Sequence, residues 1–509
     1  MEEKVNIAPT EEQKKEEASY SHVLKYTSLL GGVQVFYILM AIIRNKLTAV
    51  LIGVAGVGLA DLYARTIELI GNTTNFGLSF SAIPKISQFY DEGVQRMLRR
   101  QVRLIRSLAL FAALLGVVTG CLAAPWLSLA FQGSYAYTWA FILLSPAIGF
   151  SALTCGESAI LKGTRQLKTI AAISGLGAFC TLLLTVPIYY LWGIRGVLPV
   201  IVLGCAMLFG LHLKATVKLF PYRLIWNVRY LWRKGSPVLR LGLAYISAGI
   251  LGSGSEMLIR AVMVKSDGGL DSVGLYAAGL TLVVSYARLI FVTMDADYFP
   301  RLSATMNHKG QMNKTINSQI DVLVLLMAPF LIVFSLSLPL VLDILYTRSF
   351  YPVIPMVICA LPYMFFKAVY SPIAYLPLAH GDSKLYFVME FVYDVFFALV
   401  VIMGYTYYGL IGAGCGLALA NLLDLVLQPL VYGRVYGFRF QGETLRRCGV
   451  QGLLLLMGLI LSVSTSLLFK ATGGLLLCLL SFALSWHLLQ SEITSSARFQ
   501  KIISKIKRR

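Results

Sequence analysis

Long apolar runs are the feature that most constrains the fold of this chain. Stretches of about 20 apolar residues, the length that crosses a bilayer core as a helix, recur from Ser21 to Gln490 with short polar breaks between them. Of the 509 residues, 57% are hydrophobic and only 13% are charged, so water cannot be the main solvent. The runs lack the alternation of a membrane β-barrel. The sequence therefore predicts an all-α polytopic membrane protein with about fourteen transmembrane helices.

The basic residues predict how the chain is oriented. The formal net charge of +20 would suggest nucleic-acid binding in a soluble protein, so the placement of the 44 Lys and Arg residues decides. With both termini cytoplasmic, about 32 of them fall in cytoplasmic segments and about 6 in outer loops. This asymmetry obeys the positive-inside rule, so membrane topology and anionic lipid headgroups explain the basic residues without nucleic-acid binding. We expect the protein to lie in the bacterial inner membrane.

A weak internal repeat runs through the first twelve spans. At one constant offset of 216 residues, Arg44 falls on Arg260, and Gly193-Ile-Arg-Gly196 falls on Gly409-Leu-Ile-Gly412. Six spans per half is an even number, so both halves enter the membrane from the same side and the repeat is parallel. The last two spans have no counterpart in the repeat.

The repeat predicts two six-helix lobes and an appended helix pair. We expect five segments: a cytoplasmic tail (1–21), an N-lobe (22–234), a C-lobe (235–448), an extra helix pair (449–490) and a basic cytoplasmic tail (491–509).

Ionisable residues inside the spans mark the candidate site, because a charge near the bilayer centre costs about 2.5 to 3.5 kcal/mol and persists mainly where it faces water or a partner. In the second span, polar residues at helical spacing share one face, and further spans add cations from both halves. The candidate cations are Arg44, Arg65, Arg260, Arg288 and Lys367. The polar residues expected beside them in a cavity are Asp61, Glu68, Asn72, Asn75, Glu256, Ser285, Tyr363 and Tyr370.

Two plainer interpretations of these charges stay open. Asp61 with Arg65, and Glu256 with Arg260, are spaced as self-neutralising helical pairs that help insertion and packing. The acids Glu157, Glu390, Asp394 and Asp424 are candidates for ion coupling, or lie near the interface and pair with the lobe cations.

The sequence argues against several chemistries. It contains no GxxxxGK[ST] motif, so the chain is not by itself an ATP-driven pump. The eight cysteines and five histidines show no metal-ligand spacing, and nothing suggests a nucleophilic triad. We therefore expect a transporter without metal or cofactor, rather than an enzyme.

Four stretches near the N-terminus form a recognisable pattern: Thr27-Ser-Leu-Leu-Gly-Gly-Val-Gln34, Ile42-Ile-Arg-Asn-Lys-Leu-Thr-Ala-Val-Leu-Ile-Gly53, Gly56-Val-Gly-Leu59 and Asn75-Phe-Gly-Leu78. They resemble those of the O-antigen translocases, the Wzx-type polysaccharide flippases. That family belongs to the multidrug/oligosaccharidyl-lipid/polysaccharide (MOP) exporter superfamily, which also contains multidrug extruders and the lipid II flippase. The resemblance implies two lobes around a cavity that opens to each side in turn. It also implies a cationic lining for the pyrophosphate of an undecaprenyl carrier, a role in lipopolysaccharide biosynthesis, and contact with membrane lipids and polysaccharide polymerase machinery.

Other functions compete with this hypothesis. A multidrug exporter would favour an acidic or apolar cavity, and a lipid II flippase would carry a related substrate. A membrane polymerase or ligase acting on the same lipid would need large outer loops, whereas every predicted outer loop is short. A structural scaffold leaves the intramembrane charges unexplained. The coupling ion, H⁺ or Na⁺, stays open.

Overall fold

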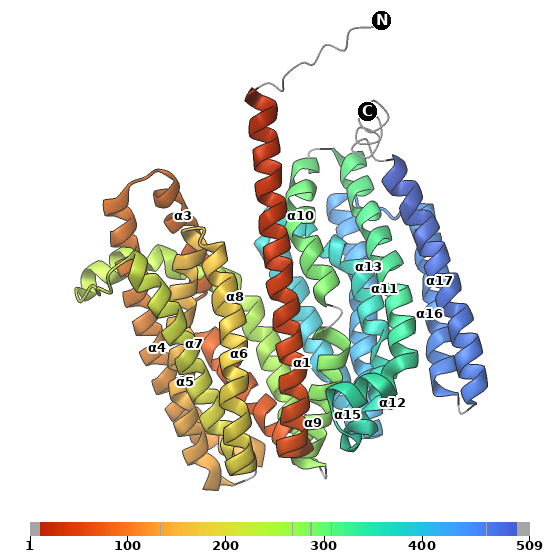
Figure 1. Ribbon diagram of the computed structural model, residues 1–509, viewed down its shortest axis with the longest axis horizontal. Helices are drawn as coiled ribbons and strands as arrows, with labels where there is room; N and C mark the ends of the chain where they lie inside the picture. Colours follow the sequence, from red (N-terminus) through yellow and green to blue (C-terminus); the bar gives the residue numbers. More distant parts are fainter. Residues whose placement is uncertain are drawn as a thin grey trace, which may run out of the picture. The chain divides into compact units, whose positions relative to one another are not determined.

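The computed structural model describes residues 11–495, apart from 133, 267, 286–287, 307 and 465. Side chains are described from residue 36 to 490, with further gaps at 132, 228, 237, 240–246, 248, 288–289, 292–297, 467–468, 471 and 489. The described residues are helical almost throughout and include no β-strand, as predicted (Figure 1).

The helices follow the predicted order of spans. In the first part of the chain they are α1 (Glu11–Thr74), α2 (Leu78–Ser81), α3 (Ile83–Asp91), α4 (Gln95–Gln132), η1 (Tyr135–Tyr137), α5 (Thr138–Gly163), α6 (Leu167–Trp192), η2 (Gly193–Gly196) and α7 (Val197–Leu219). They continue with α8 (Val228–Lys265), α9 (Gly269–Leu280), η3 (Thr281–Ser285), α10 (Arg288–Thr305), α11 (Lys309–Leu345), η4 (Arg348–Val353), α12 (Ile354–Ala360), α13 (Pro362–Ala374), α14 (Leu376–His380), α15 (Ser383–Tyr436), α16 (Gly442–Val463) and α17 (Leu467–Ser495).

Length and composition identify the membrane-crossing helices. Within the residues searched, seven helices are long and apolar enough to cross a bilayer, or up to eight if the bent pair formed by 348–360 and 362–380 is one span. Three of the seven, Phe36–Thr74, Leu167–Leu219 and Ser383–Tyr436, are 39, 53 and 54 residues long, so each is long enough to hold about two spans. The protein is therefore a multi-pass membrane protein.

Glycines with positive φ interrupt the helices that hold two spans. Gly53 breaks α1 at φ 67° and ψ −167°, and Gly409 breaks α15 at φ 60° and ψ −143°. Gly193 ends α6 at φ 52° and ψ −134°. A side chain is strained in this left-handed region, so glycine lets the chain reverse direction between two spans without a long loop.

The 216-residue repeat is present in the three-dimensional structure. Gly193 and Gly409 are repeat-equivalent and share nearly the same backbone angles, and Gly53 and Gly269 both have positive φ. Two helix starts also match at this offset: α5 begins at Thr138 as α12 begins at Ile354, and α6 begins at Leu167 as α15 begins at Ser383. The sequence matches therefore reflect duplicated structure.

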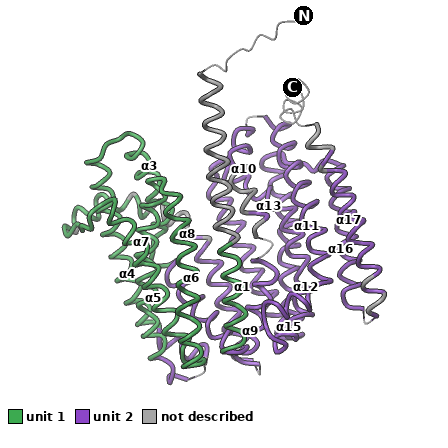
Figure 2. Tube along the Cα trace, in the orientation of Figure 1, with its two compact units in different colours: residues 1–51, 73–123, 139–243 green, residues 52–72, 124–138, 244–509 purple. Residues whose placement is uncertain are grey.

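The chain divides into two compact units (Figure 2). Unit 1 comprises residues 1–51, 73–123 and 139–243, and unit 2 comprises 52–72, 124–138 and 244–509. The segment 52–72 thus belongs to unit 2, although the residues that precede and follow it in the sequence belong to unit 1.

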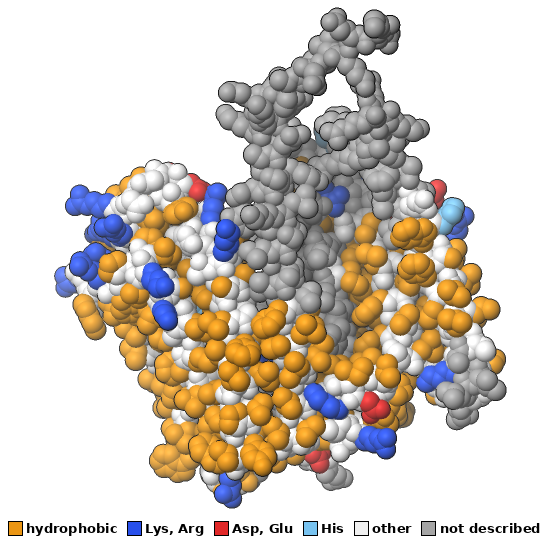
Figure 3. Space-filling view, in the orientation of Figure 1, with side chains coloured by type: hydrophobic (Ala, Val, Ile, Leu, Met, Phe, Trp, Pro, Cys, Tyr) orange, Lys and Arg blue, Asp and Glu red, His pale blue; other side chains and the backbone are white. Residues whose placement is uncertain are grey.

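Each unit has its own apolar core. In unit 1, buried side chains of α4 and α5, such as Leu104, Ala109 and Ala152, pack with Val238 of α8. In unit 2, α11 is the most buried of the described membrane-crossing helices: 56% of its most apolar stretch of 18 residues is buried. The lipid-facing surface is different in character: the face shown in Figure 3 is mostly hydrophobic, and large side chains such as Trp126 and Leu453 are over 60% exposed.

Two glycines bring the second half of α1 against α9 inside unit 2. A Cβ atom at Gly58 would overlap the carbonyl oxygen of Leu270, and one at Gly274 would overlap the carbonyl oxygen of Val54. Gly58 and Gly274 are repeat-equivalent, as are Val54 and Leu270, so the crossing is symmetric within the repeat. Small residues allow such backbone approach between membrane helices.

Replacing Gly58 by Ala should therefore sharply lower the yield of folded protein in detergent, because backbone atoms of α9 would have to move. Gly71 lies on the same helix with nothing within 4 Å of an added Cβ. Gly71→Ala is thus the matched control and should keep or slightly raise stability, since Ala favours the helix over Gly by about 1 kcal/mol. Size-exclusion yield and thermal midpoint measure both. Equal behaviour of the two variants would contradict the close crossing.

Candidate functional site

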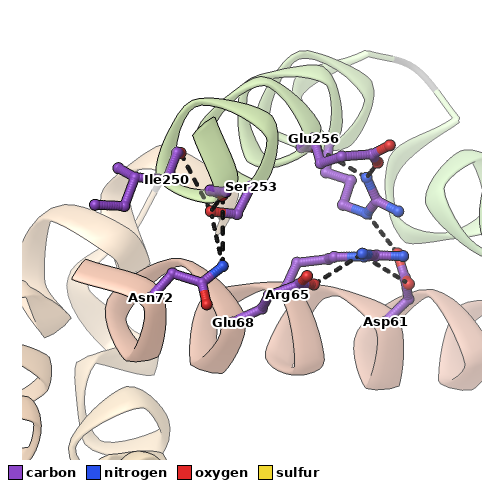
Figure 4. Close-up of polar contacts among 9 residues, drawn as sticks. Asp61, Arg65, Glu68, Asn72, Ile250, Ser253 and Glu256 are labelled. Atoms are coloured by element: carbon purple, nitrogen blue, oxygen red, sulfur yellow. Dashed lines mark hydrogen bonds and ion pairs between the residues drawn. The ribbon is translucent and has the colours of Figure 1, made fainter. Parts of the chain in front are cut away.

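A polar seam joins the second half of α1 to α8 in unit 2 (Figure 4). The Asn72 side chain donates to the backbone oxygen of Gly249 at 3.4 Å and lies 3.5 Å from Ser253 Oγ. Two turns earlier in α1, Arg65 Nη1 donates to Glu68 Oε2 at 2.8 Å, and Arg65 Nε lies 3.6 Å from Asp61 Oδ1. The spacing that puts these residues on one helix face thus brings them together in space.

Arg260 of α8 is the centre of the seam. Its Nε donates to Asp61 Oδ2 at 2.5 Å, and its Nη1 donates to both the carboxylate and the backbone oxygen of Glu256. The guanidinium carbon also lies 5.4 Å from the ring centroid of Tyr276. A buried cation is stable only when nearby groups neutralise its charge and accept its hydrogen bonds. The carboxylates of Asp61 and Glu256 fill both roles for Arg260.

Arg260 is 0% exposed, whereas the side chains of Asp61 and Glu256 are 17% and 22% exposed. The carboxylates therefore stand between the guanidinium and open space. Within the described residues, only Nη2 of this guanidinium lacks a hydrogen-bond partner. A bound anion would reach Arg260 only after displacing a carboxylate, so the geometry assigns Arg260 first to holding α1 on α8.

A cavity of about 380 Å³ opens beside the seam, entirely within unit 2. Its charged lining comprises three carboxylates and one guanidinium, and tyrosine, serine and threonine hydroxyls and apolar side chains form the rest. The lining residues are Asp61, Arg65, Gly252, Glu256, Ala277, Leu280, Thr281, Val283, Val284, Ser285, Tyr363, Tyr393, Asp394, Phe397 and Leu417.

Asp394 of α15 is the most buried acid in the cavity, at 6% exposed. Its Oδ2 has no hydrogen-bond partner in the part of the chain that the structure describes. Opposite it, a Cβ built on Gly252 would lie 3.6 and 3.7 Å from the two carboxylate oxygens, so only glycine leaves this side of the acid open. A buried carboxylate oxygen without a donor is suited to accept a proton or a cation.

A second polar cluster adjoins the cavity through Tyr363 and Tyr393. Lys367 Nζ lies 5.7 Å from the ring of Tyr363 and 5.8 Å from the ring of Phe291. It interacts electrostatically with Glu390 and Asp424 without a close ion pair among the described residues.

Hydrogen bonds fix the aromatic part of this second cluster. Tyr370 Oη donates to Asn421 Oδ1 at 2.7 Å, and Asn421 Nδ2 donates to Tyr393 Oη at 3.2 Å. Tyr370 is 7% exposed and does not line the cavity. Its hydroxyl therefore serves packing between α13 and α15.

The remaining predicted site residues lie elsewhere. Arg44, Asn75 and Glu157 belong to unit 1, and the side chain of Arg288 lies outside the described residues. Arg44 interacts with Tyr189, and Asn75 lies beside Cys155.

Glu157 forms a buried two-point ion pair with Arg106. The Arg106 Nε to Glu157 Oε1 distance is 2.9 Å, and Nη2 to Oε2 is 3.2 Å, with both side chains at most 3% exposed. Arg106 Nη1 also donates to the backbone oxygens of Phe220 and Pro221. Glu157 is therefore engaged in a buried ion pair that joins α5 to α4.

Sequence reasoning missed several residues of the site. Tyr393 and Phe397 line the cavity, and Asn421 links two tyrosines, but each looks like an ordinary residue in an apolar span. Arg106 lies at the predicted start of a span and has no acid one turn away in the sequence. This missing local partner was the one signal that could have predicted a partner on another helix. Its partner, Glu157, is 51 residues distant, which no local pattern shows.

Replacing Arg260 by Met should cost about 3–5 kcal/mol in the free energy of unfolding, because Glu256 would lose its counter-charge and Asp61 would keep only the partly exposed Arg65. Arg65→Met is the control: Arg65 is 31% exposed, and its loss should cost under about 1 kcal/mol. Denaturant unfolding in detergent micelles measures both. Adding Asp61→Asn to Arg260→Met should recover part of the loss, and equal losses for the two single variants would contradict the central role of Arg260.

Comparison with known proteins shows what the fold resembles. No protein-family model and no curated protein matches the chain. A lipid II flippase, MurJ, in an inward closed conformation is 14% identical with a TM-score of 0.67, over 91% of this chain and 99% of that one. An inward-facing MATE multidrug transporter is 15% identical with a TM-score of 0.64, over 82% and 96%. A MOP superfamily transporter from Pyrococcus furiosus is 14% identical with a TM-score of 0.52, over 80% and 92%. The chain therefore has the fold of the MOP superfamily transporters.

Proposed function

We propose that this protein is a flippase that moves an undecaprenyl-pyrophosphate-linked oligosaccharide, of the O-antigen repeat type, from the inner to the outer leaflet of the bacterial inner membrane. The observation that carries the proposal is the fold shared with the lipid II flippase, which the chain matches over 99% of that protein. The lipid II flippase acts on a lipid, whereas the MATE neighbours are multidrug transporters. Lipid II itself is the alternative substrate of the same chemical class.

The physical task explains why a polar cavity is needed. A sugar pyrophosphate cannot cross hydrocarbon unaided, while its polyprenyl tail can stay in the bilayer. Alternating access with the tail outside the cavity supplies a polar path without opening a pore. The cavity beside α1 and α8 offers tyrosine, serine and threonine hydroxyls for sugar groups and tyrosine rings for sugar faces.

The cationic ligands in this proposal are Arg65 and Lys367, with Arg288 as a further candidate from the sequence. Arg65 lines the cavity and is 31% exposed, so its guanidinium is accessible to a ligand. Lys367 lies against Tyr363 of the cavity wall. Arg260 contributes by fixing the helix face that presents Arg65.

The acids of unit 2 supply the proposed coupling. Asp394 has a carboxylate oxygen without a donor among the described residues, and Glu390 and Asp424 are close enough to influence each other and Lys367. Protons or Na⁺ bound here would change the charge of the cavity lining and so bias it toward one facing state. Downhill entry of the cation would then drive the uphill movement of the headgroup.

A multidrug or cation exporter is the second candidate, and the charge of the cavity favours it. Three carboxylates face one guanidinium, which suits a cationic substrate better than a pyrophosphate.

For the flippase, we propose a location in the bacterial inner membrane with both termini cytoplasmic. There it would contact the polysaccharide polymerase machinery.

The first test is complementation in cells that lack their native O-antigen flippase or their lipid II flippase. Arg65→Gln should reduce glycan export at least about tenfold, because one charge-assisted contact to the pyrophosphate is lost, and Arg65→Lys should retain more. Arg195→Gln, which removes an exposed arginine of unit 1, is the control and should act as wild type. The readout is the amount of carrier-linked glycan in the outer leaflet at matched membrane expression.

Drug resistance distinguishes the second candidate. If the chain complements neither flippase but raises resistance to lipophilic cations, and Asp394→Asn or Glu256→Gln removes that resistance, the flippase proposal is wrong and the exporter is right. If the chain complements only the strain that lacks the lipid II flippase, its substrate is lipid II and the protein is still a flippase of lipid-linked glycans.

Ion coupling has its own prediction. In proteoliposomes, an imposed proton or Na⁺ gradient should accelerate transport by the wild type, and Asp394→Asn should abolish this acceleration while leaving transport without a gradient. Asp271→Asn, which neutralises an exposed acid at the start of α9, should keep the full gradient response. Gradient dependence that survives Asp394→Asn would exclude Asp394 as the coupling group.

A further inference from the structure

An arginine-lined groove lies in unit 1, separate from the residues of the candidate site. It has a volume of about 750 Å³ and is formed by the first turns of α4, the chain between α7 and α8, and the first turn of α8. Four arginines of α4 line one wall, and Ile225, Asn227 and Tyr230 line the other. In Figure 3, Lys and Arg side chains gather at the end of unit 1 that carries α3. The lining residues are Gln95, Arg96, Arg99, Arg100, Arg103, Ile225, Asn227 and Tyr230.

The arginines share one helix face because their spacing is helical. Steps of 3, 1 and 3 residues from Arg96 to Arg103 place all four side chains along about 10 Å of α4. The positive end of the helix dipole adds to the same field. Concentrating like charges in this way is unfavourable unless an anion neutralises them.

No acid neutralises the groove in the part of the chain that the structure describes. None of the four arginines forms an ion pair there. The acids nearest in sequence are engaged elsewhere: Asp91 pairs with Arg165 at 2.6 Å, and Glu92 accepts from Gln88 at 2.8 Å. The groove therefore presents four unmatched positive charges.

The opposite wall is held rigidly. Arg106, anchored by Glu157, donates to the backbone oxygens of Phe220 and Pro221, and Ser107 Oγ accepts from the backbone of Ile225 at 2.8 Å. Further along, Arg100 stacks on the ring of Tyr230, with its guanidinium carbon 4.8 Å from the centroid. The arginines thus face a preformed wall, which lowers the entropy cost of binding a ligand.

Exposed tryptophans place the groove at the depth of lipid headgroups. Trp226 is 82% exposed and Trp232 is 53% exposed, and both adjoin the groove in sequence. Tryptophan favours the membrane–water interface, where its ring contacts acyl chains and its N–H contacts headgroups. Basic grooves at that depth bind lipid phosphates.

We propose that this groove binds a phospholipid whose headgroup carries two phosphodiesters, of the cardiolipin type. Four guanidiniums spread over about 10 Å match two separated phosphates better than one phosphate or one compact pyrophosphate. Arg96 and Arg103 form the two ends of the site along α4, and Arg100, stacked on Tyr230, lies between them. The occupant is a resident membrane lipid, distinct from the transported substrate.

The test uses the full-length protein purified in detergent and native mass spectrometry, with titration by cardiolipin, by phosphatidylglycerol or by undecaprenyl pyrophosphate. Wild type should bind cardiolipin at least about tenfold more tightly than phosphatidylglycerol, which has one phosphate. Arg99→Gln with Arg103→Gln should weaken cardiolipin binding at least about tenfold, because each guanidinium contributes a charge-assisted hydrogen bond. Arg434→Gln with Arg446→Gln removes two exposed arginines of unit 2 and should leave binding unchanged.

Three results would overturn the proposal. Equal cardiolipin binding by the Arg99/Arg103 variant and the control would place the lipid elsewhere. Equal affinity for cardiolipin and phosphatidylglycerol would exclude a two-phosphate site. Tighter binding of undecaprenyl pyrophosphate, weakened by the same variant, would identify the groove as a substrate entry site instead. A thermal midpoint within error of wild type without lipid confirms that the variants fold.

Discussion

The buried contact of Arg260 with Asp61 and Glu256 is the interaction on which unit 2 depends. A cation with no exposure could not remain in an apolar span without these two acids, and they could not lie so close together without the cation. The contact ties residues 52–72 of α1 to α8, which positions Arg65 and the cavity wall. The cavity is therefore polar because a structural charge cluster borders it, and its acids serve both stability and the proposed chemistry.

The two halves of the repeat differ where this contact lies. Arg44 and Arg260 are equivalent, yet Arg44 lies beside Tyr189 in unit 1 and Arg260 lies between two carboxylates in unit 2. The glycines that break or end helices kept their backbone angles in both halves, while the charged side chains did not keep their surroundings. Conserving the backbone of a duplicated lobe thus leaves its polar residues free to take different roles.

The sequence predicts much of the fold because the bilayer imposes it. Helical spans, their order and the repeat follow from apolar length, polar breaks and the offset of 216 residues. The face shared by Asp61, Arg65, Glu68 and Asn72 follows from helical spacing. In contrast, the partner of each charge does not: Asp61 is 199 residues from Arg260, and Arg106 is 51 residues from Glu157. Those pairings arise from how spans pack. Apolar periodicity leaves the packing undetermined, because in most spans the side that faces lipid and the side that faces other helices are both hydrophobic.

The crossing of Gly58 and Gly274 has a mechanical consequence. Backbone meets backbone there, since the atoms nearest to both glycines are backbone atoms of the facing helix. A contact of this kind resists sliding, since a carbonyl oxygen faces each glycine. Separating the two helices here would need no side chain at position 58 or 274 to change rotamer, because neither glycine has one.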